Sequence, residues 1–130
     1  MILMNLLMTA SLSAAANHVA DMKWQKRVLL VAAPDAGDAS LVDQRRIVAR
    51  WQSAADERDL AVVEIVGDRV VGASDAAATL RQRYRLPAAG FTVVLIGKDG
   101  GAKLRRTRPI PAAILEETID AMPMRRGGGR

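Results

Sequence analysis

The sequence predicts a single α/β domain, and three observations support this fold class. The chain of 130 residues is long enough for one packed core and short for two ordinary domains. Hydrophobic residues make up 50% of it but aromatic residues only 3%, so the core must consist largely of Val, Leu, Ile and Ala. Its short apolar runs alternate with segments of helical periodicity, which is typical of β-α-β units.

Three short apolar runs and one more polar segment predict four strands. Arg27–Ala33 lies between charged residues and a proline, and it predicts a central strand buried on both faces. Leu60–Val66 predicts a second strand, parallel to the first. Residues 91–97 predict a third, and the Asp99-Gly100 turn predicts a hairpin to Ala102–Arg106, whose charges would protect a sheet edge.

Three helical segments complete the order of elements. The first starts at Ser40 and carries Trp51 on its apolar stripe; the second runs over residues 75–85 and carries Tyr84. We expect both rings to pack in the core. The third starts at Pro111 and ends at Pro123. The resulting order, β-α-β, α, β-β-α, predicts a three-layer sandwich with helices on both faces of the sheet.

This order of elements resembles the thioredoxin fold, which implies a four-stranded mixed sheet in the order 4-3-1-2. Thioredoxins carry Cys-x-x-Cys in the loop after the first strand and a cis-proline before the third. Here that loop, residues 34–39, contains Ala36-Gly37-Asp38-Ala39, Phe91 stands at the proline position, and the chain has no cysteine. Disulfide exchange needs a thiolate, so dithiol oxidoreductase and thiol peroxidase activities are excluded.

A narrower resemblance rests on residues 23–34, 63–68, 90–101 and 119–125, which include the motifs IGKDGG and DAMPMR. Together these segments resemble the family called domain of unknown function 4174. Its members are short exported bacterial proteins, and related domains occur in a secreted vertebrate matrix protein. The resemblance therefore implies an exported, non-catalytic module whose partner is a protein or a matrix component.

The first 16 residues predict where in the cell the protein is located. Residues 1–16 are apolar and end in Ser13-Ala14-Ala15-Ala16, an A-x-A pattern that predicts cleavage after Ala16 although no Lys or Arg precedes the apolar run. The segment is shorter than the ~20 residues that span a bilayer, and the alternative to a signal peptide is a buried N-terminal helix. We expect a signal peptide over 1–16, a thioredoxin-like domain over 17–124, a flexible basic tail over 125–130, and a periplasmic or secreted protein.

Three aspartates mark the candidate site. Asp35, Asp38 and Asp68 follow the first two strands, and we expect them near one another with Phe91 close by, at the carboxyl edge where open α/β sheets bind ligands. They could hold a cation or a basic peptide, or serve an enzyme of unrecognised type; the alternative is that Asp35 and Asp38 are turn and cap residues. We assign no catalytic residue, metal or cofactor. Glu64, inside an apolar strand, is expected to pair with an arginine or to face solvent.

The C-terminal half carries much of the net charge of +5. Its cations Lys103, Arg105, Arg106 and Arg108 are candidate contacts for an anionic envelope surface; the alternative is a solvated basic edge. No aromatic residue lies within this stretch, which argues against binding of single-stranded nucleic acid.

Overall fold

The structure is a computed structural model that describes residues 17–126, and it is an α/β sandwich around one mixed sheet. The five strands lie in the order β3-β2-β1-β4-β5. Their bounds are β1 Arg27–Ala33, β2 Leu60–Val66, β3 Arg69–Val71, β4 Thr92–Ile96 and β5 Ala102–Arg106. β2 runs parallel to β1, and β4 runs antiparallel to it. The helical elements are η1 Val19–Met22, α2 Ala39–Arg50, α3 Gln52–Glu57, α4 Ala77–Tyr84, α5 Ala112–Asp120 and α6 Pro123–Arg126.

The predicted sandwich is confirmed, but the prediction of four strands is wrong. The four predicted strands keep their predicted order, as β5-β4-β1-β2, and β3 adds a fifth strand beyond β2. β3 follows the two-residue turn Gly67–Asp68, in which Gly67 has φ +59°, and pairs back onto β2. With three residues it is too short to show a periodic pattern in the sequence.

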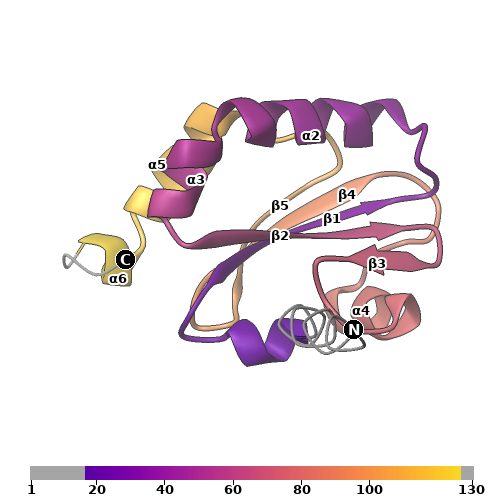
Figure 1. The fold of residues 1–130 in the computed structure, drawn as a ribbon, viewed down its shortest axis with the longest axis horizontal. Helices are drawn as coiled ribbons and strands as arrows, with labels where there is room; N and C mark the ends of the chain where they lie inside the picture. The colour runs from indigo at the N-terminus through magenta and orange to yellow at the C-terminus, as the bar shows by residue number, and fades with distance from the viewer. Residues whose placement is uncertain (1–16, 127–130) are drawn as a thin grey trace, which may run out of the picture.

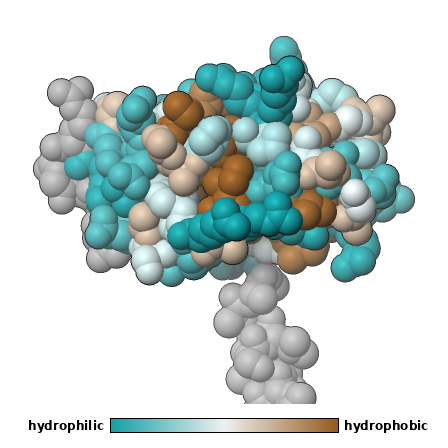
Figure 2. All heavy atoms as spheres, turned by 90° about the horizontal axis from the view of Figure 1, so that it is seen from above, coloured by the Kyte–Doolittle hydropathy of each residue, from teal (hydrophilic) through white to brown (hydrophobic). Residues whose placement is uncertain are grey.

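Alternate residues of the central strand pack in two separate core layers, one on each face of the sheet. β1 is buried along its whole length, as predicted. Leu29 and Val31 pack on the side of α2, α3 and α5, whereas Leu30 and Ala32 pack on the side of α4 and η1. Figure 1 shows these two helical layers above and below the sheet. The α2 side, seen in Figure 2, is largely hydrophilic with single hydrophobic residues between.

Trp51 is a core residue, as predicted. Its side chain is 9% exposed and its indole Nε1 donates to Glu116 Oε1 at 2.9 Å. Trp51 also separates α2 from α3, with φ −110° and ψ 12°, so that the expected single helix is two helices.

The N-terminal segment is fixed to the α4 side by its backbone. The Val19 N–H donates to the buried Asp75 Oδ1 at 2.8 Å, and Ser74 N–H donates to Asn17 O at 2.9 Å. His18, for which the sequence indicates no role, places Nδ1 3.5 Å from Asp75 Oδ2. The backbone of residues 17–19 is thus attached to the loop that precedes α4. In the described part of the chain, no helix has the length and apolar character needed to cross a membrane.

The chain continues as a helix beyond the predicted C-terminal boundary. α5 ends at Asp120, and Pro123 begins α6, a position that suits proline because a first helical residue needs no N–H partner. Within α6, Arg125 pairs with Glu57 at 2.9 Å and with Asp120 at 3.3 Å. The segment predicted as a basic tail therefore starts as an ion-paired helix, and residues 127–130 lie outside the described residues.

Candidate functional site

At the carboxyl end of β1, two of the three predicted aspartates accept hydrogen bonds from backbone N–H groups two and three residues further along the chain. Asp35 Oδ1 accepts the Gly37 N–H at 2.9 Å, and Asp38 Oδ2 accepts the Leu41 N–H at 3.1 Å as the N-cap of α2. These are the turn and cap roles that such residues have beside a helix start. The Ala36-Gly37-Asp38-Ala39 segment that stands in place of Cys-x-x-Cys is thus a turn that leads into the first residue of α2.

The third aspartate and Phe91 do not complete a ligand site with them. Asp68 lies in the turn after β2, next to the end of β1, where Gly67 N–H donates to Ala33 O at 3.0 Å. Phe91 is 7% exposed and packs in the core on the α2 side, because it precedes β4 on the same face as Val93. Within residues 17–126, no group of three or more His, Cys, Asp or Glu is placed to hold a metal ion.

On the predicted basic edge, three of the four cations have hydrogen-bond partners. Lys103 Nζ donates to Asp99 Oδ2 at 2.8 Å. Arg105 donates to the backbone carbonyls of Tyr84 and Arg85, and so places a cation at the C-terminal end of α4, where the helix dipole favours one. Arg106 donates to a backbone carbonyl at 3.0 Å, and Arg108 is exposed.

A cavity that the sequence analysis missed lies at the opposite end of the sheet, beside the amino end of β1. We call it the Trp24 pocket; its volume is about 190 Å³. Its lining consists of charged, apolar and glycine residues from three distant segments: Trp24, Arg27, Gly97, Lys98, Asp99, Lys103, Met122, Pro123 and Met124.

Trp24 is the most exposed large hydrophobic residue described, at 60%, and its backbone has φ +71°. That left-handed conformation is unfavourable for a residue with a bulky side chain. It is held by a hydrogen bond from the Trp24 N–H to Lys98 O at 2.6 Å. Lys23 Nζ lies 5.5 Å from the centroid of the indole ring, within the range of a cation–π contact.

Beneath the rim, the Trp24 pocket has a buried positive charge. Arg27 is 1% exposed; its Nη1 donates to Arg58 O at 2.7 Å, and its Nε lies 3.4 Å from Met122 Sδ. Burial lowers the pKa of Arg27, and the nearby Arg125 adds to this, but a guanidinium remains charged at neutral pH. Lys98 is also buried, and its Nζ donates to Asp59 Oδ2 at 3.0 Å.

The segments that carry the family resemblance meet at this end of the sheet. Trp24 and Arg27 come from residues 23–34, Lys98 from the IGKDGG motif and Met122 from the DAMPMR motif. The sequence signal for the Trp24 pocket was therefore the pair of motifs IGKDGG and DAMPMR. Because they lie about two dozen residues apart in the chain, they indicate a common surface only once the fold is known.

The sequence profile of the domain of unknown function DUF4174 matches residues 18–127. No curated protein matches the sequence. Solved structures do. The chain is similar to a reduced 2-Cys peroxiredoxin of Plasmodium vivax, with TM-score 0.63, 12% identity and 84% of each chain covered.

Two further solved structures are similar to this chain. One is thioredoxin peroxidase I of Plasmodium yoelii, with TM-score 0.63, 13% identity and coverage of 86% of this chain and 81% of that one. The other is a protein assigned as the thiol:disulfide interchange protein DsbE of Chlorobium tepidum, with TM-score 0.58, 17% identity and coverage of 79% and 83%. At these identities the likeness shows the fold alone. The chain has a thioredoxin-like fold and belongs to the family of the domain of unknown function DUF4174.

Proposed function

We propose that this protein is an exported thioredoxin-like module without thiol chemistry that binds a protein or matrix partner through the Trp24 pocket. The observation that carries the proposal is the exposed Trp24 ring on a left-handed backbone. Such a conformation costs about 1–2 kcal/mol in a non-glycine residue, and strain of this kind persists where the surrounding structure imposes it, most often at functional sites.

The surroundings of Trp24 have the composition of an interface centre. Met124 is 40% exposed beside it, and the charged groups of Arg27 and Lys98 lie buried behind. Trp, Met and Arg are enriched at the centres of protein interfaces, where Trp and Arg contribute most of the binding energy.

The two other functions that the sequence leaves open have less support. An enzyme at the carboxyl edge would need free carboxylates, but those of Asp35 and Asp38 accept hydrogen bonds from the adjacent backbone. An anionic-surface contact would use Lys103 and Arg105, which have partners within the chain.

Export is supported by the position of the predicted cleavage site. Cleavage after Ala16 would leave the contacts of Asn17 and Val19 with the α4 side in place. We expect the mature mass to correspond to a chain that starts at Asn17, recovered from the periplasm or the medium. A full-length chain in the cytosol would contradict export.

The binding role is tested by photo-crosslinking in the producing cell. A benzoylphenylalanine at position 24 or 124 should give a discrete adduct, because these side chains form the rim of the Trp24 pocket. The matched controls are positions 71 and 114, where Val71 is 50% and Ile114 36% exposed on other elements. Adducts of equal yield at all four positions, or at none, would overturn the proposal.

A second variant separates binding from folding. Trp24→Gly removes the ring and also relieves the positive φ, so the free energy of unfolding should stay the same or rise. Capture of the crosslinked partner by the purified variant should fall by about tenfold or more, as for a typical hot-spot residue. A stable Trp24→Gly protein with undiminished capture would place the partner elsewhere.

A further inference from the structure

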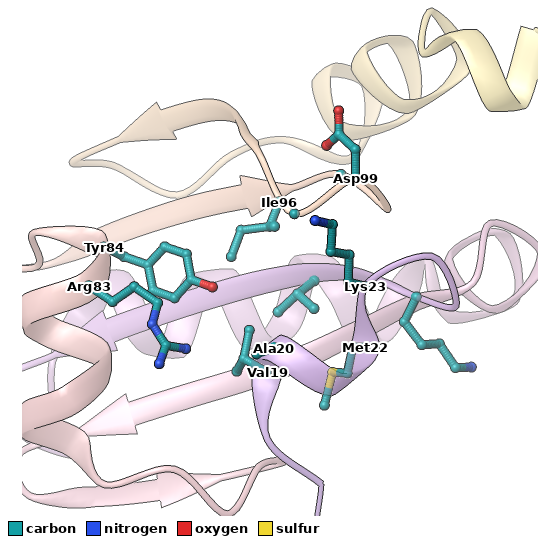
Figure 3. A pocket seen from close by; sticks show the side chains of 12 residues that line it. Val19, Ala20, Met22, Lys23, Arg83, Tyr84, Ile96 and Asp99 are labelled. Atoms are coloured by element: carbon teal, nitrogen blue, oxygen red, sulfur yellow. The ribbon is translucent and has the colours of Figure 1, made fainter.

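A second cavity lies on the α4 side of the sheet, and nothing above assigns it a role. We call it the Tyr84 pocket. It lies between η1, β1, β4 and α4, has a volume of about 220 Å³, and is shown in Figure 3. Its lining includes the buried residues Val19, Val28 and Ile96 and the polar residues Tyr84, Lys23 and Lys26. An apolar cavity of about 150 Å³ can hold a benzene ring, so this one has room for a compact apolar group.

The phenol of Tyr84 points into this cavity. Its ring packs against the core on the α4 side, and Figure 3 shows the hydroxyl directed toward the side on which Lys23 stands. Among residues 17–126, the hydroxyl has no hydrogen-bond partner. The backbone at this point is fixed, because Arg105 donates to the carbonyls of Tyr84 and Arg85. A positioned donor therefore faces an apolar space.

The charges around the cavity favour an anion. Lys23 and Lys26 line it, and neither forms an ion pair within the described part of the chain. The third cation, Arg83, stacks on the Tyr84 ring at 6.0 Å and lies 3.9 Å from Asp75.

Asp99 is the one acidic residue of the lining, and its charge is compensated. Its carboxylate points away from the cavity in Figure 3, and it accepts hydrogen bonds from Lys103 Nζ at 2.8 Å and Gly101 N–H at 2.9 Å. The bond from Lys103 is the main reason that the pKa of Asp99 is lowered. The lining therefore keeps a positive balance.

We propose that the Tyr84 pocket binds a carboxylate that carries a compact apolar group. The apolar part would lie on Val19, Val28 and Ile96, and the carboxylate would accept a hydrogen bond from the Tyr84 hydroxyl and pair with Lys23 and Lys26. The Tyr84 pocket adjoins the Trp24 pocket, with which it shares Gly97 and Asp99, and Lys23 also contacts the Trp24 ring. The phenol and apolar lining belong to the Tyr84 pocket alone, so the proposal does not depend on the protein-binding role.

The test uses phenylacetate as the probe and amide-resolved NMR titration of the purified protein as the measurement. Saturable shifts should appear around η1, β4 and the end of α4, with a dissociation constant of about 1 mM for a ligand of this size. The uncharged phenylacetamide should bind at least tenfold more weakly if the carboxylate is recognised, since a hydrogen bond to a charged acceptor is stronger than one to a neutral acceptor. Equal affinity for the amide, or no saturation with phenylacetate up to ~20 mM, would overturn the proposal.

Two variants identify the groups involved. Tyr84→Phe keeps the ring and should weaken phenylacetate binding about three- to tenfold, as expected for one lost hydrogen bond. The double variant Lys23→Gln/Lys26→Gln should weaken it tenfold or more. Its control, Arg46→Gln/Arg50→Gln, removes the same net charge from α2, on the opposite face of the sheet. An equal loss of phenylacetate affinity in this control would show that net charge alone explains the effect, and it would contradict the site.

A competition experiment with a peptide distinguishes the two sources of such a ligand, the carboxyl end of a polypeptide and a small carboxylate. Acetyl-Gly-Gly-Phe with a free carboxyl end should compete with phenylacetate, and its C-terminal amide should not, if the source is the end of a polypeptide. If phenylacetate binds and the peptide with the free carboxyl end does not compete, the source is a small carboxylate. Either result supports the site. Tyr84→Phe should leave the crosslinks from position 24 unchanged, so failure of this proposal and failure of the protein-binding role are distinguishable.

Discussion

Gln44 is buried within α2, and its side-chain amide bonds to the backbone of Ile110 in both directions. Nε2 donates to Ile110 O at 3.1 Å, and the Ile110 N–H donates to Oε1 at 2.8 Å. One side chain thereby satisfies a buried donor and a buried acceptor of the segment that precedes α5. This pair of bonds attaches the chain just before α5 to α2.

We expect Gln44→Leu to destabilise the protein, because it leaves the N–H and the carbonyl of Ile110 buried without partners. The expected loss is about 2–4 kcal/mol in the free energy of unfolding, measured by urea denaturation. Gln52→Leu serves as the control, since Gln52 is exposed and bonds only to Asp56 in its own helix. A Gln44→Leu protein as stable as the control would show that water replaces these bonds.

The start of α2 is the element on which the predicted and observed roles of the carboxyl edge differ. Asp38 accepts the Leu41 N–H there, at the point where a redox-active thioredoxin carries its sulfur chemistry. The role of this side chain is to begin a helix. A cap needs an oxygen acceptor but no charge, whereas a cation site needs the charge.

This difference gives a direct test. Asp38→Ala should lower the free energy of unfolding by about 1 kcal/mol, while Asp38→Asn should leave it nearly unchanged. The triple variant Asp35→Asn/Asp38→Asn/Asp68→Asn should show the same thermal shift with Mg²⁺ or Ca²⁺ as the wild type. A metal-induced stabilisation that the triple variant abolishes would restore the edge as a cation site.

The elements could be predicted where a local pattern encodes them. β1 is a continuous apolar run, and the expected arginine partner of Glu64 is Arg45, whose guanidinium bonds to both carboxylate oxygens at 2.9 and 2.7 Å. β3 has only three residues, and the break at Trp51 lies inside one apolar stripe, so neither has a local signature.

The two cavities could not be predicted either, because their linings leave no local pattern in the sequence. The Trp24 pocket joins three segments that only the sheet topology brings together. The sequence predicts Tyr84 as a packing residue, which holds for its ring. The cavity that its hydroxyl faces is lined in part by η1, whose place beside α4 no local pattern indicates.

At the scale of the whole molecule, an ionic network connects α3, α5 and α6. Arg58, whose side chain is 9% exposed, donates from Nε and Nη2 to the two carboxylate oxygens of Asp120 at 3.0 and 3.1 Å. Arg125 joins Asp120 to Glu57. Hydrogen bonds from Arg58, and then its charge, hold the pKa of Asp120 below its ordinary value. The network thus adds ion pairs to the apolar packing of α5 in the core and joins α6 to α3.

Because this pKa is lower in the folded state, the ionised Asp120 stabilises the fold above its ordinary pKa of 3.8, and the contribution is lost as the pH falls through the folded pKa. Asp120→Asn should therefore be less stable than wild type at pH 7, and the difference should narrow below about pH 4. Urea unfolding at a series of pH values measures it, with the exposed Asp56→Asn as control. A difference that is constant with pH would mean that the charge of Asp120 is not involved.

The contrast between the two tryptophans gives the chain an optical reporter of its own. Trp51 is 9% exposed and Trp24 60%, so a dissolved quencher such as iodide reaches one indole and leaves the emission of the other. The fluorescence therefore divides into a quenchable and a protected component without any label. Any partner that covers the amino end of β1 would transfer intensity from the first component to the second, and occupancy of that surface can be followed in the unmodified protein.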